Sequence, residues 1–147
     1  MISETPPKRQ SLQHEEQSSQ THTPRPVMIN EIAFTVTPVT DLSRARGFYE
    51  GVLGLKPTSV YEEAGWVEYE IGAGAFALGK ADEKWKPSAA GSCVAFEVAD
   101  LDATLAKLKE NGVPFDMEAI DTPVCRMAVV LDPDGSKVMV HKRKGAA

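Results

Sequence analysis

Apolar and polar residues alternate along this chain with two different periods, and the order of the two periods occurs twice. In the first half, residues 32–37 are rich in β-branched side chains and predict a strand. Apolar residues at helical spacing over residues 42–52 predict a helix, which either Thr40 or Asp41 can cap. Three further strands are expected, at residues 57–62, 66–71 and 75–79.

The second half shows the same order of elements. A strand is expected at residues 93–98, followed by a helix that begins after Asp100 and ends at Asn111 and Gly112. Three strands follow, at residues 114–120, 124–131 and 137–141. A Pro-Asp-Gly turn at residues 132–135 is expected to join the last two.

A short sequence match supports a duplication. The residues VTDL at 39–42 match VADL at 98–101, 59 positions later. The chain therefore predicts an α+β fold of two βαβββ modules, at about residues 29–80 and 91–147, related by a pseudo-twofold axis. Because each module has only one helix to cover its sheet, the other faces are free to form a curved mixed-sheet cup.

Residues 1–27 differ from the rest of the chain in composition. They are dominated by Ser, Thr, Gln and Pro and contain few large apolar groups, so we expect a disordered tail there and a single domain at residues 28–147. Met28 stands where the folded pattern begins, and a start of translation at Met28 is an open alternative.

Charge and cysteine content narrow the classes of partner. Sixteen Lys and Arg against 21 Asp and Glu give a net charge of −5, which argues against binding to nucleic-acid phosphates. No apolar run has the length of a membrane span or of a secretion signal, so we expect a cytoplasmic protein without membrane partners. Two cysteines, Cys93 and Cys125, are expected as reduced thiols in strands, with Cys93 a small buried hydrophobe.

Two motifs carry a resemblance to a known family. The sequence FYEGVLGL lies in the first strand–helix segment, and LDPDGSKVMVH forms the late hairpin. Together, in a duplicated βαβββ frame, they resemble the vicinal oxygen chelate superfamily, which includes glyoxalase I, bleomycin-resistance proteins, fosfomycin-resistance enzymes and extradiol dioxygenases. The resemblance implies a cup, commonly within a homodimer, whose metal-using members place ligands on the first and last strand of each module.

The residues at the positions of those ligands are not metal donors of the usual kind. By resemblance, the ligand positions fall on Phe34, near Ala77, on Cys93 and on Met139. A thiol beside phenyl, methyl and thioether groups does not match the imidazole and carboxylate ligands that such divalent ions require. We therefore expect no metal cofactor.

Strand alternation predicts which side chains face the cup. The face would have an apolar floor and acidic walls, which favours a cationic or amphipathic organic ligand. The expected ligand-binding residues are Phe34, Val36, Trp66, Glu68, Glu70, Cys93, Glu97, Met139 and His141.

Three functions compete. The first is a metal-independent, homodimeric protein that binds a small molecule without transforming it. The second is a glyoxalase-, lyase- or dioxygenase-like enzyme with a divalent metal relocated to Glu68, Glu97 and His141, the last being the only histidine outside the tail. The third is a dimeric interaction module whose cup has collapsed around Phe34 and Met139. The identity of the ligand, and whether one cup draws on one chain or two, stay open.

Overall fold

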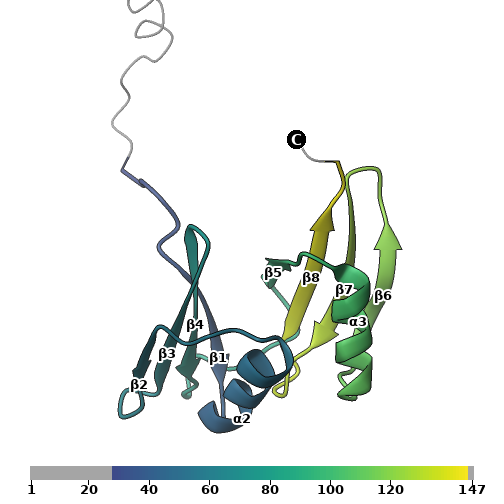
Figure 1. Cartoon of the computed structure of the whole chain (residues 1–147). Helices are drawn as coiled ribbons and strands as arrows, with labels where there is room; N and C mark the ends of the chain where they lie inside the picture. The colour runs from purple at the N-terminus through teal and green to yellow at the C-terminus, as the bar shows by residue number, and fades with distance from the viewer. Residues whose placement is uncertain (1–27, 146–147) are drawn as a thin grey trace, which may run out of the picture. The chain divides into compact units, whose positions relative to one another are not determined.

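The computed structural model of the protein describes residues 28–145, which form two four-stranded mixed sheets (Figure 1). The tail expected at residues 1–27 lies outside the described residues. Within the first module, the elements are β1 (Thr35–Val39), α2 (Leu42–Arg46), the π-helical turn η1 (Gly47–Val52), β2 (Ser59–Tyr61), β3 (Trp66–Ile71) and β4 (Gly74–Lys80). Its strand order is β1-β4-β3-β2, with β1 parallel to β4 and the other pairs antiparallel.

The second module has the same construction. Its elements are β5 (Val94–Glu97), α3 (Leu101–Glu110), β6 (Phe115–Asp121), β7 (Cys125–Leu131) and β8 (Lys137–Arg143). The strand order β5-β8-β7-β6, with β5 parallel to β8, corresponds strand by strand to the order in the first module. The predicted α+β fold of two βαβββ modules is confirmed.

The ends of the elements follow local hydrogen bonding. The Asp41 side chain accepts the backbone N–H of Arg44, and the Asp100 side chain accepts that of Ala103, each at 3.0 Å, so each helix begins with an aspartate cap. The strand predicted from residue 32 begins only at Thr35, which pairs with Phe76 of β4.

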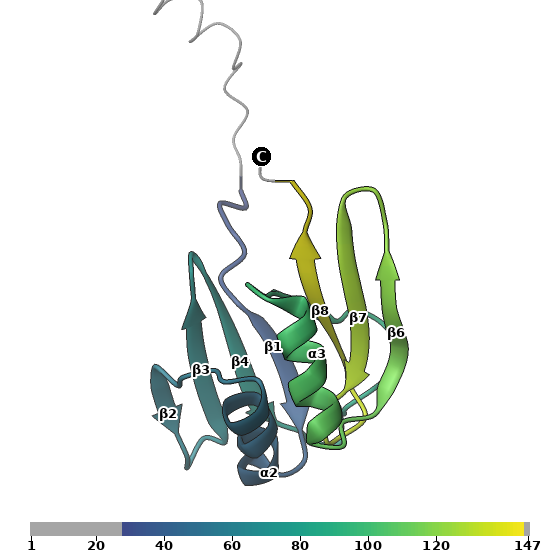
Figure 2. The ribbon, with the colours of Figure 1, turned by 45° about the vertical axis from the view of Figure 1, so that its right-hand side comes forward.

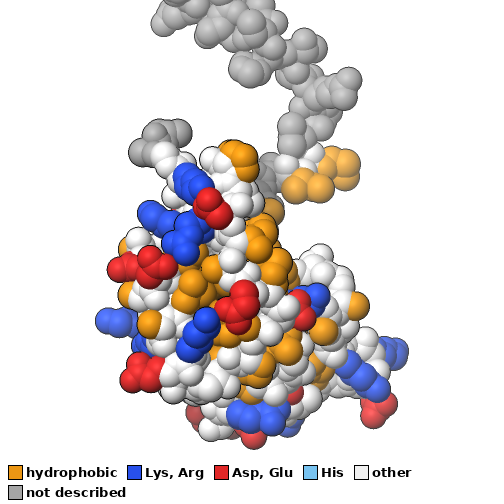
Figure 3. Space-filling model, turned by 90° about the vertical axis from the view of Figure 1, so that its right-hand side faces the viewer, with side chains coloured by type: hydrophobic (Ala, Val, Ile, Leu, Met, Phe, Trp, Pro, Cys, Tyr) orange, Lys and Arg blue, Asp and Glu red, His pale blue; other side chains and the backbone are white. Residues whose placement is uncertain are grey.

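The helix-covered faces of both sheets share one apolar core. Figure 2 shows the two helices and the two sheets, and α2 packs against β4 while α3 packs against β8. Tyr69 and Phe76 from the first sheet and Val138 and Val140 from the second are almost completely buried in a single cluster. Phe76 also contacts Phe96 across the two modules, with ring centroids 5.2 Å apart. Apolar groups also reach the surface on the side of the second module, between charged side chains (Figure 3).

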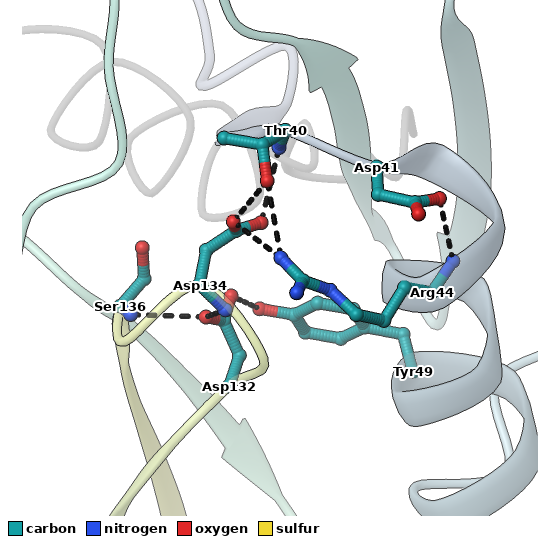
Figure 4. Close-up of polar contacts among 7 residues, drawn as sticks. All are labelled: Thr40, Asp41, Arg44, Tyr49, Asp132, Asp134 and Ser136. Carbon is teal, nitrogen blue, oxygen red and sulfur yellow. Dashed lines mark hydrogen bonds and ion pairs between the residues drawn. The ribbon is translucent and has the colours of Figure 1, made fainter.

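A buried hydrogen bond joins the first helix to the second module. The Tyr49 hydroxyl, on η1, donates to Asp132 Oδ2 at 2.7 Å, and the backbone N–H groups of Asp134 and Ser136 donate to Asp132 Oδ1, each at 2.9 Å (Figure 4). Burial raises the pKa of Asp132, while the Tyr49 hydroxyl opposes that increase. Burial also raises the pKa of Tyr49, which keeps the hydroxyl protonated as a donor.

The same turn is held from the start of α2. Asp134 accepts the backbone N–H of Thr40 at 3.1 Å, pairs with the Arg44 guanidinium at 2.9 Å and accepts the Thr40 hydroxyl (Figure 4). Gly135 adopts a φ of 82°, which lets the chain reverse here without steric strain. The β7–β8 turn is thus both the predicted hairpin and the polar contact between modules.

Replacing Tyr49 by Phe is expected to lower the free energy of unfolding by about 1–3 kcal/mol at pH 7.5, because the buried Asp132 carboxylate loses a donor. The loss should be smaller at pH 4.5. Without the Tyr49 hydroxyl, the pKa of Asp132 in the folded state rises further above its ordinary value of 3.8. The loss of stability is therefore full when the Asp132 carboxylate is ionised, and it becomes smaller as the pH falls and the carboxylate takes up a proton. Urea denaturation at the two pH values measures the difference.

The control is Tyr61→Phe, at a side chain that is 54% exposed. Equal losses at both pH values would contradict the assignment.

Candidate functional site

The first sheet has an outer face, opposite its helix, that gathers five predicted residues. The register pairs Glu68 with Ala77 and Ala77 with Val36, which places these three side chains on the face away from the core. The same alternation places Trp66 and Glu70 there, and Phe34 reaches this face ahead of β1 and contacts Trp66. We call the outward positions of β1, β3 and β4, together with Phe34, the first outer face.

Aromatic rings form part of the first outer face. The rings of Phe34 and Trp66 meet edge to face, with centroids 5.6 Å apart. The Trp66 indole N–H donates to Glu68 Oε2 at 2.8 Å, which holds a carboxylate beside the ring. Ala77 points to the same side and is fully buried, so larger neighbours cover it. The face therefore presents aromatic surface with an anchored negative charge.

Trp85 also belongs to this face, and sequence reasoning missed it. It lies in the connector between β4 and β5, and its ring packs against the backbone of Gly79 beside Trp66. The signal in the sequence was indirect: a glycine near the end of an apolar strand, and a tryptophan in an otherwise polar connector.

The second sheet has a corresponding outer face with a His–carboxylate pair. The register pairs Ala95 with Met139 and Glu97 with His141, all at positions away from the core. His141 Nδ1 and Glu97 Oε1 are 2.6 Å apart, which leaves Nε2 as the ring nitrogen for another partner. The backbone N–H of Arg143 donates to Glu97 Oε2 at 2.8 Å. The hydrogen bond from the Arg143 backbone holds the pKa of Glu97 below its ordinary value, and the contact with His141 is the next largest cause.

Methionines line the rest of this second outer face. Val129 on β7 pairs with Met117 on one side and Met139 on the other, and Met127 pairs with His141. Sequence reasoning identified Met139 but missed Met117 and Met127, whose positions depend on the register of β6 and β7. Thioether side chains are flexible and polarizable, so this face can adapt to an apolar or aromatic surface.

A cleft beside β1 brings Cys93, a further predicted residue, close to Val36. It has a volume of about 250 Å³, and Val36, Cys93 and Trp85 are among its lining residues. Cys93 is exposed and lies just before β5, so its expected burial in a strand was wrong. The strand begins one residue later, at Val94, which pairs with Val138.

A larger cavity of about 370 Å³ lies between the two modules. Phe76, Phe96 and Val140 line it with other mostly apolar groups, and Glu97 and Lys107 are its charged lining residues. Of the nine predicted residues, only Glu97 borders this cavity. The predicted residues therefore gather mainly on the two outer faces.

The positions that the resemblance assigns to metal ligands do not fit a hard divalent ion. Phe34 offers a phenyl ring, Ala77 a buried methyl group and Met139 a thioether, which leaves one thiol, Cys93. The alternative ligands are also separated, since Glu68 lies on the first sheet while Glu97 and His141 lie on the second. Within residues 28–145, no three His, Cys, Asp or Glu side chains are grouped to hold an ion.

Comparison with known proteins places the chain in a family. Residues 30–140 match the sequence model of the Glyoxalase/Bleomycin resistance protein/Dioxygenase superfamily, and the chain belongs to this superfamily. The anthracycline biosynthesis protein DauV of Streptomyces sp. (strain C5) is 36% identical over 111 residues, which are 72% of this chain and 39% of that protein. The chain thus spans well under half of that relative's length.

Solved structures share the fold. TnmS3, an antibiotic binding protein from Streptomyces sp. CB03234, superposes with a TM-score of 0.66 at 23% identity, covering 80% of this chain and 99% of TnmS3. A glyoxalase/dioxygenase from Nostoc punctiforme superposes with a TM-score of 0.69 at 16% identity, covering 84% of this chain and 98% of that one. In the part of the chain that the structure describes, no helix is long and apolar enough to span a membrane.

The Glu97 carboxyl group is expected to titrate below its ordinary pKa of 4.5 because the Arg143 backbone N–H and His141 both favour its ionised form. In the His141→Ala variant the pKa of Glu97 should rise but stay below 4.5, since the Arg143 bond is the larger cause. Carbon-13 NMR titration of the glutamate side chains measures both values. A Glu97 pKa at or above 4.5 in the wild-type protein would contradict the geometry.

Proposed function

We propose that this protein binds a small amphipathic or cationic organic molecule on its two outer faces, as a homodimer and without a metal ion. One observation carries the proposal: both sheets hold apolar, aromatic or thioether side chains on the face that their helices do not cover, with glutamates among them. Phe34 is 44% exposed, and Glu68, Met139 and His141 are only half-buried in the single chain. Such surfaces are available for a ligand.

The chemistry of the two faces supports an aromatic ligand. Indole and phenyl rings stack on flat apolar groups of a ligand, and flexible methionine side chains adapt to the shape of the ligand. Carboxylates beside indole rings favour a positive charge on the ligand. The names of two similar Streptomyces proteins, one an antibiotic binding protein and one an anthracycline biosynthesis protein, make antibiotics of this chemistry the first probes to try.

Free strand edges and exposed apolar groups support a homodimer. Among residues 28–145, β1 pairs only with β4, and β5 only with β8, so each of these strands has one edge without a partner there. Exposed apolar side chains lie directly before β1, with Ile32 83% and Phe34 44% exposed. Unpaired edges next to apolar groups favour association with another chain. A second copy could bring the first outer face of one chain to the second outer face of the other.

The enzymatic alternative requires that arrangement as well. In one chain, Glu68 lies on the first sheet, whereas Glu97 and His141 lie on the second. A relocated metal site would therefore need a carboxylate from each of two chains. The collapsed-cup alternative also finds little support in one chain, because Phe34 and Met139 stand on different sheets.

Binding is expected to be saturable and independent of metal. Titration calorimetry with doxorubicin, a cationic anthracycline, should give a measurable Kd that is unchanged after chelator treatment of untagged protein. Its N-acetyl derivative, which lacks the charge, should bind more weakly, and Glu68→Gln should remove most of that difference, about 0.5–2 kcal/mol. Mass spectrometry should recover the ligand unaltered. Absence of binding, loss of binding with the chelator, or conversion of the ligand would each contradict the proposal.

Light scattering after size-exclusion chromatography is expected to give the mass of two chains. Ile32→Lys should shift the protein toward one chain, because a charge before β1 would have to be desolvated in the dimer. Val124→Lys is the matched control, since Val124 is 70% exposed but lies at the turn between β6 and β7. A wild-type monomer, or equal effects of the two substitutions, would argue against this interface.

A further inference from the structure

Both tryptophans of the chain lie side by side on the first outer face, although they come from different parts of the sequence. Trp66 is the first residue of β3, and Trp85 stands in the connector that follows β4. Gly79 on β4 pairs with Trp66 and lies under the ring of Trp85. A Cβ atom at position 79 would come within 2.9 Å of the Trp85 ring and 3.1 Å of the Trp66 ring.

This close approach explains the glycine. Gly79 does not have a positive φ, so its backbone could be adopted by other residues, and what its missing side chain provides is space. The Trp85 indole therefore rests directly on the backbone of the sheet. Any larger residue at this position would displace one of the two rings.

The connector holds Trp85 in place before any ligand arrives. The Asp82 side chain accepts the backbone N–H groups of Lys84 and Trp85, at 2.8 and 2.9 Å. The Asp82 N–H donates to the Trp85 carbonyl at 3.0 Å, and the Ala81 N–H donates to the Val39 carbonyl of β1 at 2.8 Å. A ring fixed in this way loses little conformational freedom when it stacks on a ligand.

The charge on this face is of one sign. Among the outward positions of β1, β3 and β4, the only charged residues are Glu68 and Glu70. The cleft that Trp85 also lines contains two lysines. Lys137 is paired with Asp116 at 3.4 Å, and Lys86 is an exposed side chain. An aromatic surface with acidic neighbours favours a flat ligand that carries a positive charge.

We propose that Trp85 is the residue that determines ligand specificity, forming with Trp66, over Gly79, a stacking platform for a flat, positively charged aromatic ligand. The inference rests on the proposed function and adds to it the class of ligand and a residue outside the βαβββ modules. Glu68, fixed by the Trp66 indole N–H, faces the charge of the ligand while Trp85 covers its rings.

The test combines affinity with fluorescence. Because the chain has two tryptophans, Trp66→Phe and Trp85→Phe each leave a single reporter on the platform. Doxorubicin should quench both reporters at the concentration at which calorimetry detects binding. Trp85→Ala should weaken binding about tenfold or more, and Trp85→Phe, which keeps a ring, should weaken it less. Glu83→Gln, at an exposed side chain in the same turn, is the control and should bind like the wild type.

The outcomes separate this inference from the proposed function. Wild-type affinity in the Trp85→Ala variant, or an unquenched Trp85 reporter at saturation, would overturn the role of Trp85 while leaving ligand binding intact. Failure of the wild-type protein to bind either form of the anthracycline would overturn both. Far-ultraviolet circular dichroism establishes whether each variant is folded. If Trp85→Ala is unfolded, the affinity of Trp85→Phe decides whether Trp85 contributes to binding.

Discussion

The buried contact between Tyr49 and Asp132 fixes how the two halves of this chain meet. A tyrosine on the first helix gives its hydroxyl to a carboxylate in the last hairpin, and that carboxylate in turn holds the backbone of its own turn. Because both partners are polar and buried, separating them would leave unpaired polar groups in an apolar core. The helix-covered faces of both sheets are therefore buried in the shared core, and the opposite faces are available for other contacts.

Those opposite faces have different chemistry, and in our proposal they hold one ligand between two copies of the chain. One is rigid, because its indole rings rest on small residues and are fixed by hydrogen bonds to Glu68 and through the turn at Asp82. The other is adaptable, with methionines around Val129 and a histidine held by Glu97. In our proposal, these two faces bind the ligand by stacking and charge and do not need a metal ion.

Much of this architecture could be predicted from the sequence, and the residues that the prediction missed have physical reasons for being missed. The duplication, the aspartate caps and the outward positions of Trp66, Glu68 and Glu97 followed from periodicity, since alternation in a strand fixes which side a residue faces. Met117 and Met127 were missed because their placement depends on which residues pair across β6, β7 and β8. Trp85 was missed because no periodicity governs a connector, and its place depends on the space that Gly79 leaves. The bond from Tyr49 to Asp132 spans 83 residues, a distance at which no local pattern gives information.

A crystal structure of the protein with doxorubicin bound would test the central claim most directly. We expect density for the rings against Trp66 and Trp85, with the amine directed toward Glu68 and a second chain covering the opposite side. Density in the cavity between Phe76 and Phe96 instead, or an ion held by His141 and glutamates from two chains, would contradict it.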